Sequence, residues 1–352
     1  MKNLDFGRCA LGICVAAALT GCGGSQPPIG APGAGSATLE KATGGSYLYV
    51  SNDYEDSVVL FSYDPKSMTA NLVGQYGVNA EPVGSCSDAH GNVYVVAYSG
   101  YTSVITEFAF GTLTPMQTLD YAGDGRPTGC SVDPTTGDLA VTIGSNEYST
   151  PAAVLIFTNG SGTPEQIDAC DYNGTAGYDP HGNLWLECLM KGSSSILELP
   201  KGESSFQSVT FGHNLYYLGA IQWDGKYLDV SVALNNANYY TEDIYQTTIS
   251  RSALKTKHTI TFQRGPRGGG GRGCGNGLYF SQWAMVSKKP DDLPTTEATQ
   301  LIAANSDCTR LPIWNYPAGG RPARSLRPPV KYRADYYPTG VTYVTQPEMG
   351  LH

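Results

Sequence analysis

The chain has 352 residues, of which 41% are hydrophobic and only 15% are charged, against roughly 25% charged in an ordinary domain. This composition excludes a disordered polyampholyte, because the hydrophobic residues suffice for a core, and it excludes coiled coils, which need many Ala, Glu, Lys and Leu residues. Tyr (24), Gly (43) and Pro (22) are abundant, which is typical of an all-β protein with many turns. The formal charge of −9 argues against a nucleic-acid partner, since phosphate binding needs Lys and Arg.

The first 21 residues have the pattern of an export signal. Lys2 and Arg8 precede a short apolar stretch, residues 10–18, which is too short to span a bilayer as a helix. The Leu-Thr-Gly-Cys sequence at 19–22 resembles a bacterial lipobox, in which the Cys thiol accepts a diacylglycerol and the preceding peptide is removed. We therefore expect residues 1–21 to be a lipoprotein signal peptide and Cys22 to be the lipidation site. Removing Lys2, Asp5 and Arg8 changes the formal charge from −9 to −10.

Residues 22–44 follow as a stretch rich in Gly, Pro, Ala and Ser that can bury little apolar surface. Such a flexible tether reaches roughly 25 Å on average. Gly23 stands after the Cys, at a position where an Asp would resemble an inner-membrane retention signal. We therefore expect a membrane-anchored lipoprotein of the cell envelope, in the outer membrane if the cell has one.

A repeat of about 45 residues fills the remaining segment, 45–352. Its clearest marks are Asp88, Asp133, Asp179 and Asp224, each in a tight turn between two expected strands. An apolar third strand and a more polar fourth strand follow, as at 104–108 and 116–119. Four short strands per repeat of this length are the sequence signature of a β-propeller blade.

The repeat predicts a single all-β domain, a six-bladed β-propeller. Second strands are expected to begin near residues 47, 93, 139, 184, 227 and 301. Three stretches look like insertions into the repeat: 234–245, 263–276 and 287–299. Without them the remaining length also fits six units. A different choice of insertions would leave room for seven. Residues 338–344 match a first strand and Tyr47–Val50 match a second strand, so pairing between the two ends should close the ring.

The units at Pro82–Val95 and Ile313–Gly320 resemble NHL-type and gluconolactonase-like six-bladed propellers, and the resemblance extends over residues 45–352. It implies the fold and leaves the function open between protein-binding platforms, lactonases and lyases. Gluconolactonase-like enzymes hold a divalent metal at the channel mouth with a Glu, Asn residues and an Asp. The residues that could correspond to these ligands are Asp53, Glu147, Asn235 and Asn305, which do not reproduce the family's full ligand set.

The sequence predicts no catalytic residue and no cofactor apart from this divalent metal. It contains no HExxH and no Gly-x-Ser-x-Gly motif. Asn235, Tyr239 and Tyr240 are candidate ligand contacts, because exposed Tyr suits sugar faces and peptides, although β-sheet packing also favours Tyr. We expect a monomeric, non-enzymatic binding module for a protein or carbohydrate ligand. The alternative is a metal-dependent lactonase, hydrolase or lyase.

Six Cys residues remain in the expected mature chain, an even number that favours disulfides in an exported protein. We expect at least two bridges. Cys170 with Cys188 and Cys274 with Cys308 are the preferred pairs, because each pair lies near one blade.

The lipobox predicts that Cys22→Ala prevents lipidation and releases the protein from membranes. Cell fractionation measures this, with Cys14→Ala in the removed segment as the control. A Cys22→Ala protein that still fractionates with membranes as the wild type does would refute the lipid anchor.

Overall fold

The computed structural model describes residues 45–100, 102–123, 125–144, 151–190, 193–215, 219–233, 241–250, 253–263, 282–286, 297–304, 310–326 and 338–346. These residues form strands and turns, with two short 3-10 helices, η1 (Asp53–Glu55) and η2 (Thr158–Gly160). None of the helices in these ranges is long and apolar enough to cross a membrane. Residues 1–44 lie outside the described part, so the signal peptide, the tether and the lipidation of Cys22 stay predictions.

Four sheets of four strands each surround the axis. The first contains β25 (Pro338–Thr345), β1 (Ser46–Asn52), β2 (Ser57–Asp64) and β3 (Thr69–Gly77). The second contains β4 (Glu81–Ser87), β5 (Val93–Ser99), β6 (Thr102–Phe108) and β7 (Pro115–Tyr121). The third contains β8 (Arg126–Val132), β9 (Leu139–Gly144), β10 (Ala152–Phe157) and β11 (Glu165–Cys170). Another contains β21 (Gln282–Val286), β22 (Gln300–Ala304), β23 (Leu311–Asn315) and β24 (Arg324–Leu326).

A nine-stranded sheet contributes two further units. One consists of β12 (Tyr172–Asn173), β13 (Gly177–Tyr178), β14 (Leu184–Met190), β15 (Ser193–Leu199) and β16 (Gln207–Phe211). The other consists of β17 (Ile221–Trp223), β18 (Leu228–Ala233), β19 (Thr241–Ser250) and β20 (Ala253–Gln263). The short parallel pairing of β16 with β20 joins their outer strands into one sheet.

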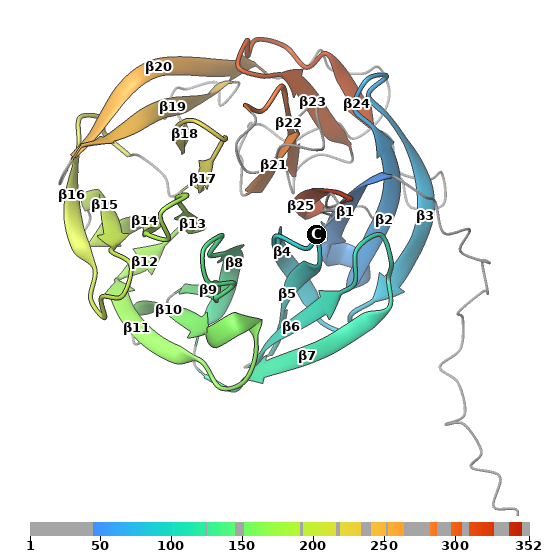
Figure 1. The fold of residues 1–352 in the computed structure, drawn as a ribbon, viewed down its shortest axis with the longest axis horizontal. Coiled ribbons are helices and arrows are strands. Elements are labelled where there is room, and N and C mark those ends of the chain that lie inside the picture. Colours follow the sequence, from blue (N-terminus) through green and yellow to red (C-terminus); the bar gives the residue numbers. More distant parts are fainter. Residues whose placement is uncertain are drawn as a thin grey trace, which may run out of the picture. The chain divides into compact units, whose positions relative to one another are not determined.

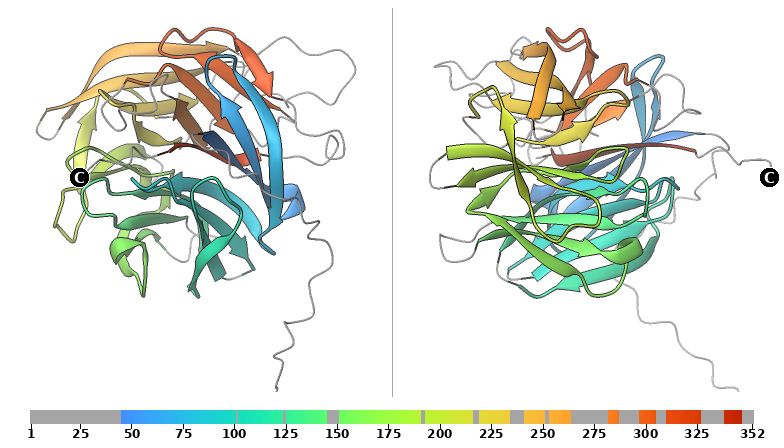
Figure 2. Two further views of the ribbon diagram at one scale, coloured as in Figure 1. Left: turned by 45° about the vertical axis from the view of Figure 1, so that its right-hand side comes forward. Right: turned by 60° about the vertical axis from the view of Figure 1, so that its left-hand side comes forward.

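The strands are arranged as a β-propeller, which confirms the predicted fold class (Figure 1). The first strand of each unit lies nearest the axis and the last strand forms the rim (Figure 1). The two turned views show twisted sheets side by side around the ring (Figure 2). The described strands thus group into six units, counting two in the nine-stranded sheet.

The core consists of apolar clusters between neighbouring units rather than one central core. In β2, Val58 and Leu60 pack into the cluster shared with the next unit, whereas Val59 and Phe61 pack into the cluster shared with the last unit. Both faces of a middle strand are therefore buried, and its sequence is apolar without alternation. The outer strand β7 contacts neighbours less and alternates between half-buried and exposed residues.

The two ends of the described domain close the ring as predicted. β25 pairs antiparallel with β1, and Val341 lies opposite Val50. Both residues are buried in the cluster that joins the last unit to the first. In Figure 1 the red strand β25 accordingly lies beside the blue strand β1.

Two disulfides are present, so the prediction of disulfides is confirmed. Cys170 and Cys188 form one of them, as preferred from the sequence, with a Cα–Cα distance of 5.9 Å. Cys86 and Cys130 form the other, with a Cα–Cα distance of 5.6 Å, and it links inner strands β4 and β8 of adjacent units. The sequence analysis did not anticipate this pair. Cys274 and Cys308 lie outside the described residues.

The expected second strands begin within one residue of the observed ones, at Ser46, Val93, Leu139, Leu184, Leu228 and Gln300. One expected insertion was partly wrong. Residues 241–245 belong to β19, where Ile244 and Tyr245 are buried against neighbouring units. This strand begins with the polar residues Thr-Glu-Asp, which do not match the apolar pattern expected of a buried strand, so its start was predicted as part of an insertion.

Ring closure predicts that Val341→Asp destabilises the domain by more than about 3 kcal/mol, because it buries an unpaired charge between the first and last units. Denaturant unfolding measures this change. Leu72→Asp is the matched control, since Leu72 lies in the outer strand of the same sheet and is 47% exposed. Equal, small effects of the two substitutions would contradict the role of β25 in closure.

Candidate functional site

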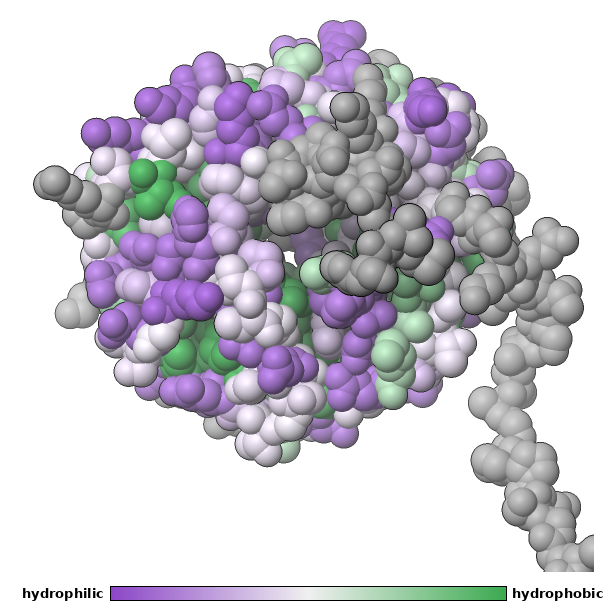
Figure 3. Space-filling view, viewed as in Figure 1, coloured by the Kyte–Doolittle hydropathy of each residue, from purple (hydrophilic) through white to green (hydrophobic). Residues whose placement is uncertain are grey.

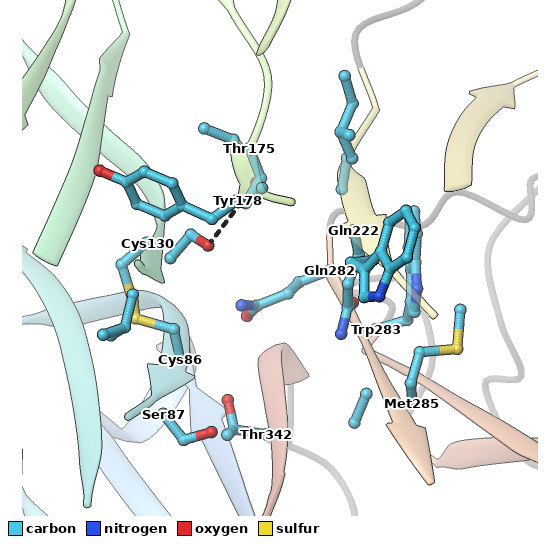
Figure 4. Close-up of a pocket in the computed structure, with 18 of the residues that line it drawn as sticks. Cys86, Ser87, Cys130, Thr175, Tyr178, Gln222, Gln282, Trp283, Met285 and Thr342 are labelled. Carbon is cyan, nitrogen blue, oxygen red and sulfur yellow. Dashed lines mark hydrogen bonds between the residues drawn. A yellow bond between two sulfur atoms is a disulfide. The ribbon is translucent and has the colours of Figure 1, made fainter. Parts of the chain in front are cut away.

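A cavity of about 270 Å³ lies on the axis of the propeller. Its wall contains residues from the inner strand of each of the six units, namely 85–87, 130–132, 175–178, 220–223, 282–285 and 341–343, with turn residues 134, 179 and 180. Figure 4 shows Tyr178, Cys130 and Cys86 on one side of the cavity and Gln222, Trp283 and Met285 on the other. In the space-filling view a hollow is visible near the centre of a mostly hydrophilic face (Figure 3).

The inner strands β25, β4 and β8 lie very close to one another at one end of this cavity. A Cβ atom at Gly84 would lie 3.1 Å from the Cα of Gly129, and one at Gly340 would lie 2.7 Å from the Cα of Gly84. Any larger residue would therefore push adjacent units apart. The lining begins directly after these glycines, at Ser85, Cys130 and Val341. It continues to the carboxyl ends of β4 and β8 and to residue 343 in β25.

Gln282 covers this narrow end. Its side chain extends from β21 to β4, where Oε1 accepts a hydrogen bond from the Ser85 N–H at 3.0 Å and Nε2 donates to the Ser85 carbonyl. The Gln282 Oε1 atom also lies beside Gly84 and Gly340. The neutral Gln282 amide thus pairs with the N–H and the carbonyl of Ser85 in β4, two units away, and forms the floor of the cavity.

Hydroxyl and amide groups supply most of the polar surface of the wall. The Ser85 Oγ and Thr342 Oγ1 atoms are 2.8 Å apart and share a hydrogen bond. Ser131 Oγ accepts a hydrogen bond from the Tyr178 N–H at 3.1 Å, which leaves its own proton available. Gln222 is half-buried in the wall and its amide makes no hydrogen bond within the described residues. Among the described residues, none of those that line the cavity is Lys, Arg or His.

Asp179 is the carboxylate of the lining, and its oxygens are occupied by its own turn. Oδ1 accepts hydrogen bonds from the N–H groups of His181 and Asn183, and Oδ2 accepts from Asn183 Nδ2 and Trp185 Nε1. Gly182 follows with a φ of +85°, which this turn requires. Four donors hold the side chain in place, so Asp179 acts as a structural cap and not as a base facing the cavity.

Of the metal ligands suggested by the family resemblance, the structure describes Asp53, which does not line this cavity. Asp53 follows strand β1, beside the amino-terminal end of inner strand β25, whereas the cavity is lined from the carboxyl-terminal halves of the inner strands. Its pKa is raised by partial burial and by the nearby Glu81. Glu147, Asn235 and Asn305 lie outside the described residues, as do the candidate contacts Tyr239 and Tyr240.

The described residues do not assemble a donor set for a divalent metal. They contain no group of three His, Cys, Asp or Glu side chains placed to hold one ion. Asp179, the acidic residue in the cavity wall, has both oxygens bound within its turn. Of the four suggested ligands the described residues include only Asp53, and one carboxylate does not make a divalent-metal site.

A second polar cluster lies between the fifth and sixth units, behind the cavity wall. The Tyr316 hydroxyl lies 2.7 Å from Asp224 Oδ2, 2.6 Å from Asp229 Oδ2 and 2.8 Å from Gln246 Nε2. One hydroxyl proton cannot serve two carboxylates, so a second proton must be shared within the cluster. Burial, reinforced by the charge of Asp224, raises the pKa of Asp229 well above its ordinary value, which favours Asp229 over Asp224 as the site of that proton.

Glu187 is a further buried acid, located at the boundary between the fourth and fifth units. Its Oε2 accepts a hydrogen bond of 2.7 Å from the Gly219 N–H, and its Oε1 has no partner within the described residues. Burial raises the pKa of Glu187 from 4.5 to about 8, and the hydrogen bond from Gly219 lowers it only in part. Neither Glu187 nor Asp229 lines the cavity.

Comparison with known proteins supports the fold and no closer assignment. No family model and no curated protein sequence matches the chain. Among solved structures, a chain of the nidogen–laminin complex is similar at 12% identity with a TM-score of 0.60, covering 85% of this chain and 98% of its own. TolB of Acinetobacter baumannii is similar at 16% identity with a TM-score of 0.55, covering 86% of this chain and 67% of its own.

A protein of Bacteroides fragilis proposed to be a 6-phosphogluconolactonase is similar at 11% identity, with a TM-score of 0.53 and coverage of 87% of this chain and 99% of its own. At such low identities the likeness shows a shared β-propeller fold. The same fold occurs in binding proteins and in enzymes, so it does not choose between them.

The raised pKa of Glu187 predicts that the domain loses stability as pH rises. The folded state holds a proton that the unfolded chain releases near pH 4.5, so the stabilisation is complete below that pH and disappears as pH approaches about 8. Glu187→Gln should flatten part of the decline in unfolding free energy between pH 5 and 8, whereas Glu203→Gln on the exposed surface should not. Denaturant unfolding at several pH values measures this dependence. If the unfolding free energy of Glu187→Gln falls with pH as steeply as that of the wild type, Glu187 is not neutral in the folded state.

Proposed function

We propose that this chain is a non-enzymatic binding module of the cell envelope, with its ligand site in the central cavity. The observation that supports it best is the chemistry of the wall, where hydroxyl and amide groups face a common space and the carboxylate of Asp179 is already occupied. Such a wall offers hydrogen bonds for recognition, while the neighbouring acids Asp229 and Glu187 are buried in structural roles.

The proposed location rests on the sequence. A lipid on Cys22 followed by a flexible tether would hold the ring near a membrane surface, and an outer-membrane position fits Gly23. The two disulfides fit an oxidising compartment outside the cytoplasm. The ligand would be a carbohydrate or a protein segment, and the module would act as a monomer.

A metal-dependent lactonase is the second candidate, favoured by the likeness to the proposed 6-phosphogluconolactonase. Its ligands would be those suggested by the family resemblance, including Glu147 and Asn235. That site would lie beside the amino-terminal ends of the inner strands, where Asp53 lies, and not in the cavity described above.

The binding-module proposal predicts that divalent metals leave the melting temperature within about 1 °C of its value in EDTA, because no native-state metal site stabilises the fold by mass action. Thermal unfolding with Ca²⁺, Mn²⁺ or Zn²⁺ measures this. If a metal raises the melting temperature by more than this, and Glu147→Gln or Asn235→Ala abolishes the increase, the binding-module proposal is overturned in favour of the lactonase.

A further inference from the structure

We propose that the central cavity takes an uncharged, hydroxyl-rich small molecule with an apolar face, a neutral sugar ring. This inference rests on the proposed binding function and names the ligand class of that same site. It follows from the charge, the size and the mixed polarity of the wall.

Charge is the strongest constraint. Because the described residues of the lining include no Lys, Arg or His, they would leave an anionic ligand buried without a counter-charge. A cationic ligand would need direct contact with a carboxylate oxygen, but both oxygens of Asp179 already accept hydrogen bonds from His181, Asn183 and Trp185, so they offer no free site for an ion pair. Burying an unpaired charge costs more free energy than a few hydrogen bonds return, so charged ligands are disfavoured.

The wall combines hydrogen-bonding groups with apolar surface. Ser131 has a proton to donate, and Gln222 offers both a donor and an acceptor. Trp223 and Met285 are half-buried in the same wall. The Tyr178 hydroxyl points away from the cavity, so that its ring adds apolar surface (Figure 4). A sugar ring presents hydroxyl edges and a C–H face, which matches this combination.

The volume limits the ligand to a small one. At about 270 Å³ the cavity lies at the lower end of the range of roughly 300–1,000 Å³ found for ligand pockets. The glycine contacts and Gln282 close one end, so that a long chain cannot pass through the described wall without displacing them. A single ring or the terminal ring of a glycan fits these limits.

The experiment is calorimetric titration of the full mature chain with matched sugars. The neutral probes are the methyl glycosides of glucose, galactose, mannose and N-acetylglucosamine, and the charged probes are glucuronate, glucosamine and glucose 6-phosphate. We expect at least one neutral probe to bind, and its charged counterparts to bind at least about tenfold more weakly, because their charge is buried unpaired. Equal or tighter binding of the charged probes, or no binding of any neutral probe, would overturn the inference.

Gln222→Glu provides the sharper test, because it places a carboxylate in the wall with little change of shape. It should reverse the preference for neutral over cationic sugars, so that the neutral sugar binds more weakly and glucosamine binds more tightly. Gln207→Glu is the matched control, since Gln207 is exposed on outer strand β16 and the same charge there should change neither affinity. Cooperative melting of both variants establishes that they fold, and an unchanged preference in folded Gln222→Glu would place the ligand elsewhere.

Ser131→Ala removes a donor to the ligand and also the acceptor of the Tyr178 N–H, so it should weaken binding of the neutral sugar several-fold and lower the melting temperature as well. The titration is therefore done at a temperature at which the variant is folded. Glucono-1,5-lactone is included with and without Mn²⁺ to separate the two proposals. Metal-dependent hydrolysis of the lactone would overturn the non-enzymatic function. Tight binding of a charged sugar without turnover would overturn only the ligand class.

Discussion

The convergence of the inner strands on one axis is the constraint on which the rest of the structure depends. At Gly84, Gly129 and Gly340 the strands are so close that a side chain would collide with the neighbouring unit. The ring can close only with this spacing, and closure brings β25 against β1. The cavity lies directly beyond these glycines and Gln282 extends across its narrow end, so its closed end follows from the same geometry.

Much of this architecture could be predicted because a propeller repeats its turn chemistry. The Asp of each turn binds main-chain N–H groups, as Asp88 does with His90 and Asn92, and such turns require particular residues. Middle strands were visible as apolar runs, because apolar clusters cover both of their faces. The start of β19 was missed, since its polar residues Glu242 and Asp243 are buried, a combination that no strand pattern predicts.

The site was harder to predict, because its residues are ordinary in isolation. Ser131 and Gln222 belong to no motif, and only the ring brings their strands together. The candidate residues predicted from the sequence follow the second strands, which end beside the amino-terminal ends of the first strands. The cavity is lined by residues farther along the first strands, toward their carboxyl ends. The Pro-x-Gly sequences at 82–84, 127–129 and 338–340 were the available signal, since each marks an inner strand directly before its lining residues. Likewise, the disulfide between Cys86 and Cys130 joins adjacent units, whereas the sequence-based choice paired cysteines near one blade.

The buried acids explain why perturbed carboxyl groups are a poor guide to chemistry in this fold. Asp224 accepts hydrogen bonds from Lys226 and Tyr227 in its own turn and from Tyr316 in the next unit, so it fixes the angle between two blades. Burial raises the pKa of Asp229 in the same contact, which favours its protonated form, and a neutral carboxyl costs less to bury than a charged one. The units pack face to face, and this polar cluster lies between the fifth and sixth of them, beside the apolar cluster that they share. The raised pKa values therefore belong to the packing of the units, and recognition is left to the uncharged groups that face the cavity.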